Sequence, residues 1–121
     1  VPVMFRIKRV YEAPEPQDGF RVLVDRLWPR GLSKEKARVD LWLLEVAPSD
    51  ALRKWFAHEP EKWPAFQRRY RAELKGQADR LRSLRRLARA RRVVTLVYAA
   101  ADTRRNNAVV LAGLLNRAAA R

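Results

Sequence analysis

Val22-Leu23-Val24-Asp25-Arg26-Leu27-Trp28-Pro29-Arg30-Gly31 is the stretch of this chain that decides its fold. Its first three residues are apolar and mostly β-branched, which predicts a buried strand that we expect to run from Phe20 to Trp28. Charged residues, a Trp and a Pro/Gly turn signal follow without a polar spacer. Charges beside a core persist only where they have partners. The stretch therefore predicts a buried strand whose end carries either a structural brace or a ligand site.

Two further strands are predicted, one before and one after this stretch in the sequence. Residues 3–11 alternate between apolar and polar side chains, which indicates a strand with one buried face. The run from Val93 to Tyr98 is continuously apolar and predicts another buried strand. Periodicity does not decide whether residues 41–44 form a short strand or a helical turn.

Helices are expected between these strands. Ser33 is placed to cap a short helix over residues 34–37, and Asp102 with Thr103 to cap a final helix over about residues 105–119. Apolar stripes at helical spacing predict the other helices, which begin near residues 50, 63 and 77. Strands separated by helices indicate an α/β fold. We expect a single compact domain over residues 1–121, with a small, mainly parallel sheet of three or four strands and helices packed on both faces.

The composition narrows the class of protein. The net charge is +14, which favours polyanions or phosphorylated ligands as partners. However, 21 of the 27 basic residues are Arg, a bias that a GC-rich genome also produces. With no Cys and one His, no disulfide, thiolate nucleophile or metal centre is expected, and no motif identifies a cofactor. No signal peptide or long apolar run is visible, so a cytoplasmic protein is expected.

The end of the second strand is the best place for an anion site. Ligands of parallel α/β sheets bind beyond the carboxyl ends of the strands. If the second and last strands are parallel neighbours, residues 25–33 and 100–107 meet there. Arg26 and Arg30 would then clamp an anion, and Trp28 would stack on the ligand. The full predicted set is Arg26, Trp28, Arg30, Ser33 and Asn106, with Asn106 orienting the ligand.

Each of these residues has a structural alternative. Asp25 and Arg26 are adjacent in the expected strand, so their side chains point to opposite faces and each needs a separate partner. The segment 98–107 is the best source of those partners. Trp28 also suits core packing, and a buried charge network would explain the polar residues without any ligand.

Two residues are weak candidates for proton transfer. His58 is the only imidazole, and it lies at a helix junction where it can also satisfy a free carbonyl. Asp102 suits a helix cap as well as a catalytic carboxylate. No Gly-rich phosphate loop or nucleophilic triad is present, so the sequence leaves open whether the protein is an enzyme.

The chain also allows two functions without a small ligand. One is nucleic-acid binding through a stripe of arginines on the helix at 77–92, namely Arg82, Arg85, Arg86, Arg89 and Arg92. The stripe equally suits a solvated helix face, since no aromatic side chain lies among the arginines for stacking on bases. The other is a structural or dimerising role, suggested by the Trp and Phe residues between 55 and 66, which we expect to be exposed.

The chain resembles the bacterial YeaO-like proteins, the family known as domain of unknown function 488. The resemblance covers nearly the whole length and rests on the run from Asp18 to Gly31, on Leu52-Arg53-Lys54-Trp55-Phe56-Ala57-His58, and on Tyr98-Ala99-Ala100 with Asn106-Asn107-Ala108. It implies a compact single-domain α/β fold and no particular reaction. The family pattern usually has a His before the Asn at 106, where this chain has Arg105. That difference argues against a metal site or a pair of His residues.

Overall fold

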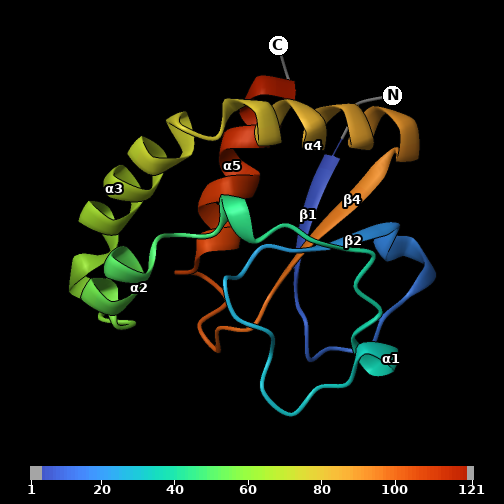
Figure 1. Ribbon diagram of the computed structural model, residues 1–121, viewed down its shortest axis with the longest axis horizontal. Coiled ribbons are helices and arrows are strands. Elements are labelled where there is room, and N and C mark those ends of the chain that lie inside the picture. Colours follow the sequence, from blue (N-terminus) through green and yellow to red (C-terminus); the bar gives the residue numbers. More distant parts are fainter. Residues whose placement is uncertain (1–3, 120–121) are drawn as a thin grey trace.

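Four parallel strands form the sheet of this protein, which is described for residues 4–119 by a computed structural model. The strands lie in the order β1-β4-β2-β3 (Figure 1), with bounds β1 Met4–Arg9, β2 Phe20–Leu23, β3 Leu41–Trp42 and β4 Val93–Tyr98. The α/β prediction with a small parallel sheet is therefore confirmed. Val3, which belongs to the predicted first strand, lies outside the described residues.

Within residues 4–119, five α-helices cover the two faces of the sheet unequally (Figure 1). Their bounds are α1 Lys34–Ala37, α2 Asp50–Phe56, α3 Trp63–Lys75, α4 Ala78–Arg91 and α5 Asn107–Ala119. Helices α2 to α5 contribute to one large core with the strand residues Phe5, Val22 and Leu96. Within residues 4–119, each helix is too short or too polar to cross a lipid bilayer.

The opposite face of the sheet carries a smaller core and a buried ionic cluster. Val10, Leu23, Ala37 and Val97 pack together there, so α1 is the helix that covers this face. Next to them, the Asp18 carboxylate lies 2.7 Å from Arg21 Nη1 and 3.2 Å from Lys8 Nζ. The side chains of Asp18 and Arg21 are almost fully buried. This cluster shows how the protein neutralises a buried carboxylate, with two cations.

The second strand is shorter than predicted. It ends at Leu23 rather than Trp28, although Val24 N–H still donates to the Val97 carbonyl at 3.2 Å. The next donor along β4, Ala99 N–H, binds the side chain of Asp25 instead of a backbone carbonyl. The Asp25 carboxylate thus takes the place of the next backbone acceptor of the sheet, and the backbone turns away from the sheet after Val24.

The final helix begins two residues later than predicted, and a different residue caps it. Asn106 Oδ1 accepts a hydrogen bond from Val109 N–H at 3.0 Å, which is the N-cap geometry for a helix that begins at Asn107. Asp102 instead accepts from the N–H groups of Arg104 and Arg105, at 2.9 and 3.0 Å. Asp102 therefore stabilises the turn before α5, and the predicted cap of the helix is wrong.

The aromatic residues between 55 and 66 are not exposed, contrary to the prediction. Phe56 and Phe66 are buried and stack with ring centroids 4.4 Å apart. Trp55 and Trp63 are partly buried, and Arg69 covers the Trp55 ring at 4.0 Å. The apolar stripe of α3 packs against α2 and the sheet core. The expected exposure of these aromatic residues, which suggested a dimerising role, is therefore wrong.

Candidate functional site

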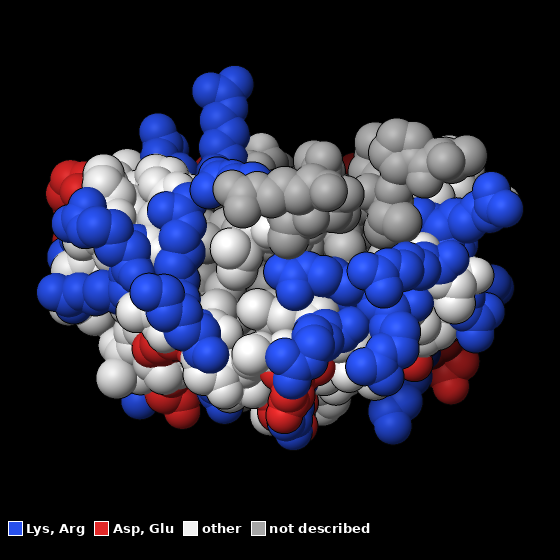
Figure 2. Space-filling model, turned by 90° about the horizontal axis from the view of Figure 1, so that it is seen from above, with Lys and Arg blue, Asp and Glu red and all other residues white. Residues whose placement is uncertain are grey.

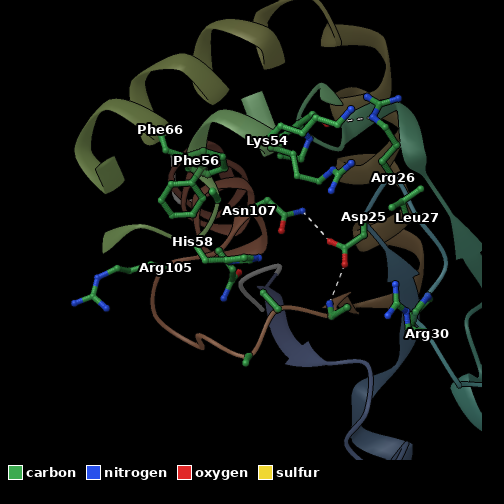
Figure 3. A pocket seen from close by; sticks show the side chains of 18 of the residues that line it. Asp25, Arg26, Leu27, Arg30, Lys54, Phe56, His58, Phe66, Arg105 and Asn107 are labelled. Carbon is green, nitrogen blue, oxygen red and sulfur yellow. Dashed lines mark hydrogen bonds between the residues drawn. The ribbon is translucent and has the colours of Figure 1, made fainter. Parts of the chain in front are cut away.

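A pocket of about 710 Å³ opens at the carboxyl ends of β2 and β4. The two strands pair in parallel, from Phe20 opposite Val94 to Leu23 opposite Val97, so the segments that leave them emerge at the same edge. The lining comes from residues 25–30, from the end of α2 and from residues 99–107 (Figure 3). The segments after β2 and β4 therefore come together at one edge of the sheet, as expected.

Asp25 lines this pocket and is held by two neutral donors. Ala99 N–H donates to Asp25 Oδ2 at 2.8 Å, and Asn107 Nδ2 donates to Oδ1 at 3.1 Å (Figure 3). Asn107 Nδ2 also donates to the Val24 carbonyl at 2.9 Å. The expected source of partners for Asp25, the segment after β4, is confirmed by these bonds. The first residue of α5 therefore connects this helix to the segment that leaves β2.

Burial raises the pKa of the Asp25 carboxyl above its usual range. The hydrogen bonds from Ala99 and Asn107 and the positive charge of His58 lower this pKa, but they do not offset the effect of burial. Asp25 is therefore a carboxylate that is costly to ionise where it lies.

Five cationic side chains line the same pocket. Arg26 and Arg30 follow β2, Arg53 and Lys54 belong to α2, and Arg105 precedes α5. Arg26 Nε donates to the Pro48 carbonyl at 3.2 Å, so its partner is not in the segment after β4 as expected.

Three of the five cations are engaged with the protein. Besides Arg26, Arg53 and Arg105 form ion pairs at 3.2 Å with Asp50 and Asp102. Arg30 and Lys54 form no ion pair within the described residues, and both are exposed. They are the cations most available to a ligand.

Aromatic side chains form the apolar part of the lining. Phe56 and Phe66 lie on one side of the pocket (Figure 3), while Trp28 contributes from the segment after β2. Trp28 Nε1 donates to the Leu32 carbonyl at 2.7 Å, and its ring meets Trp42 edge-on at 5.6 Å. Trp28 therefore packs against the smaller core and lines the pocket at the same time.

His58 points into the pocket from the turn after α2 (Figure 3). Ala57 and His58 both have left-handed backbones, with φ of 48° and 58°, a conformation that costs energy for residues with a side chain. The His58 ring is exposed and forms no hydrogen bond within the described part of the chain. The strained turn thus presents a free imidazole to the pocket, and the carbonyl contact expected of it is not present.

The predicted site residues are only partly brought together. Arg26, Trp28, Arg30, His58 and Asn106 line the pocket, whereas Ser33 and Asp102 do not. Ser33 caps α1, as expected, and accepts from Lys36 N–H at 3.2 Å. The Asn106 side chain is already bound to the backbone of Asp102 and Val109, at 2.9 and 3.0 Å.

Sequence reasoning missed the contribution of α2. Arg53 and Lys54 lie on the polar side of a short amphipathic helix, a pattern that usually indicates solvent exposure. The run Ala57-His58 carries no Gly, so nothing signalled the left-handed turn that brings the end of α2 to the sheet edge. Asp25 was recognisable as a charge after a buried strand and residues 98–107 as the source of its partners, but Asn107 was not among the predicted site residues.

The arginines of α4 form a separate surface. Leu81, Leu84 and Ala88 are buried, as predicted for the apolar face of this helix. Figure 2, which views the molecule from the side on which α4 lies, shows many Lys and Arg side chains. Arg82, Arg86, Arg89 and Arg92 are exposed, and Arg85 is partly buried. Arg82 pairs with Asp79, and Arg85 Nε is buried without a hydrogen-bond partner among the described residues.

Comparison with known proteins identifies relatives over most of the chain. A family model described as "Inactive DUF488-N3 subclade" matches residues 4–121. The uncharacterised protein Rv3073c of Mycobacterium tuberculosis is 50% identical over 111 residues, which cover 92% of each chain. Uncharacterised protein YeaO of Escherichia coli is 43% identical over 108 residues, 89% of this chain and 93% of its own. No solved structure matches. The chain therefore belongs to the YeaO-like DUF488 family, in the subclade whose model is described as inactive DUF488-N3.

Proposed function

We propose that this protein is a binding domain for a small anionic ligand, held in the pocket at the carboxyl ends of β2 and β4. The observation that carries the proposal is the convergence of five cationic side chains, from three segments, on one pocket of about 710 Å³. That volume lies in the range of small-molecule sites. Asp25 is the only carboxylate among the lining residues. A phosphate or carboxylate group is the ligand chemistry that such a lining favours.

The same pocket favours a ligand with a flat or apolar part. Phe56 and Phe66 give the pocket an aromatic wall, and Trp28 adds an indole whose Nε1 is held by the Leu32 carbonyl. An anion with an attached ring, such as a nucleotide-like molecule, would use both kinds of surface.

Binding without turnover is the form of this function that the observations favour. The matching family model is described as inactive. Asp102, a candidate for proton transfer, lies outside the pocket lining. His58 lines the pocket with Asp25, but the lining includes no Ser, Thr or Cys whose hydroxyl or thiol the imidazole could activate.

Isothermal titration calorimetry with adenosine 5′-monophosphate, adenosine and inorganic phosphate tests the proposal. We expect saturable binding of the monophosphate and weaker binding of the other two probes. Lys54→Ala and Arg30→Ala should each weaken the binding of the monophosphate at least about tenfold, since each removes a charged contact. Arg86→Ala makes the same change of charge on α4 and is the matched control. Equal losses in the pocket variants and in the control would refute a site in the pocket.

A second candidate function is binding of a nucleic-acid backbone by α4. Residues 63–92 carry eleven Lys or Arg and two Asp or Glu, so this quarter of the chain holds most of the net charge. A general Arg bias of composition does not concentrate charge in this way. None of the exposed large hydrophobic side chains lies on α3 or α4, which disfavours a lipid surface as the partner.

The second candidate makes a prediction of its own. Binding to duplex DNA, followed by fluorescence anisotropy, should weaken steeply as salt is added. Replacing Arg82, Arg85 and Arg89 with Ala should abolish the binding, whereas Lys54→Ala should leave it intact. If the triple variant binds as the parent does, this function is excluded.

A further inference from the structure

Asp25, which is partly buried, differs in its partners from the fully buried Asp18. Asp18 is neutralised by two cations, Lys8 at 3.2 Å and Arg21 at 2.7 Å. As a result, although burial raises the pKa of Asp18, hydrogen bonds from the Glu15 backbone and from Lys8 and Arg21 lower it below its usual value. Asp25 receives hydrogen bonds only from neutral donors. No ion pair within the described residues includes it.

The absence of a cation at Asp25 is not due to a lack of cations nearby. Arg26, Arg53 and Arg105 line the same pocket, yet each is held by another partner of the protein, a carbonyl or a carboxylate. Arg30 and Lys54 also line it without pairing with Asp25. A carboxylate withdrawn from water without a counter-ion destabilises the fold. The fold therefore keeps the negative charge of Asp25 separate from the positive charges around it.

This separation leaves acceptor positions free in the pocket. Each carboxylate oxygen accepts more than one hydrogen bond, and each Asp25 oxygen is used once by the protein. Asp25 lines the pocket, so the remaining positions are open to a ligand. The positive charge of His58 favours the ionised form of the Asp25 carboxylate.

We propose that the ligand of this pocket is zwitterionic, with a protonated amine that binds Asp25 and an acidic group that binds Arg30 and Lys54. This inference rests on the proposed anion-binding function and specifies its ligand class. An ammonium group supplies both the missing counter-ion and up to three hydrogen-bond donors. The aromatic residues Phe56 and Phe66 would contact the part of the ligand between its two charges.

The test compares ω-aminoalkyl phosphates of two to five carbons with the corresponding alkyl phosphates. Isothermal titration calorimetry is carried out at one fixed pH for every probe and every variant. For the best chain length, the amine-bearing probe should bind at least about tenfold more tightly than its amine-free partner. In Asp25→Asn this ratio should fall to within about twofold, whereas Lys54→Ala should weaken both probes and keep the ratio.

A second measurement does not depend on how well Asp25→Asn folds. The Ala99 amide donates to Asp25, so its ¹H–¹⁵N signal in the parent protein should move when the amine-bearing probe is added, and less with the amine-free probe. If the two probes bind equally and shift Ala99 equally, the zwitterion inference is wrong while the anion site stands. If neither probe binds, the proposed function is wrong and the inference falls with it.

Discussion

Asn107 connects the two segments that form the floor of the pocket, and its removal gives a quantitative test. Its side-chain amide donates to the Val24 carbonyl at 2.9 Å and to Asp25 Oδ1 at 3.1 Å. Asn107→Ala deletes both bonds and leaves two acceptors without a donor. A hydrogen bond to a neutral acceptor contributes about 1 kcal/mol, and one to a charged acceptor about 1.5–3 kcal/mol.

The expected loss of stability follows from these values. The two bonds together contribute about 2.5–4 kcal/mol, and because Asn107 and Asp25 both retain some contact with solvent, we expect a loss at the lower end, about 2.5–3 kcal/mol, in the free energy of unfolding. For a chain of 121 residues this corresponds to a fall in Tm of about 8–12 °C. Urea unfolding followed by circular dichroism measures the free energy, and calorimetry measures the Tm.

A double-mutant cycle isolates the bond between Asn107 and Asp25. In an Asp25→Ala background, Asn107→Ala should cost only about 1 kcal/mol, since only the bond to Val24 remains to be lost. Asn116→Ala is the matched control on the same helix: it deletes two hydrogen bonds to the Phe5 backbone, at 2.8 and 3.0 Å, and should be additive with Asp25→Ala. Additivity of Asn107→Ala with Asp25→Ala to within about 0.3 kcal/mol would refute the proposed role.

Three further predictions concern stability. The native state holds the Asp25 proton to higher pH than the unfolded chain does, so the free energy of unfolding of the parent protein, relative to that of the Asp25→Asn variant, should fall as the pH rises above 3.8. If urea unfolding gives the same difference between the two proteins from pH 4 to pH 8, this prediction is contradicted. Gly19 has φ of 63° and an added Cβ would meet the neighbouring backbone of β4, so Gly19→Ala should cost at least about 2 kcal/mol in the free energy of unfolding. Gly113 lies in open space on α5, so Gly113→Ala should stabilise the protein by about 0.5–1 kcal/mol. Thermal unfolding that ranks the two variants otherwise refutes this reasoning. Tyr70→Phe removes the bond to the Val46 carbonyl and should cost about 1–2 kcal/mol in urea unfolding, and a neutral effect would show that this bond is unimportant.

The sequence predicts the framework of this fold well because apolar patterning reports burial directly. The strand at Val93–Tyr98 and the helix at 34–37 have the predicted bounds, and the parallel pairing that a pocket required is present. The end of β2 was misplaced because Asp25 replaces a backbone partner of β4, which no local pattern reveals.

The candidate site was harder to predict because its parts come from separate segments. Arg26 and Arg30 follow a recognisable strand, so their place at the sheet edge was predictable. Lys54 lies on the polar side of α2, where the sequence pattern predicts solvent exposure, and the left-handed backbones of Ala57 and His58 after it are uncommon for residues other than Gly. The sequence also did not predict the partner of Arg26, which donates to the Pro48 carbonyl, just after η2 (Leu44–Val46), and not to the segment after β4.

The location of the anion site is the central claim, and a titration followed by ¹H–¹⁵N correlation spectroscopy tests it most directly. Pyrophosphate, added to the full chain at low salt, should shift the amide signals of residues 26–30, 53–58 and 105–107 along saturable curves that share one Kd. The α4 signals should move little over the same range. Shifts that are confined to residues 78–92, or that never saturate in the pocket, would contradict the account.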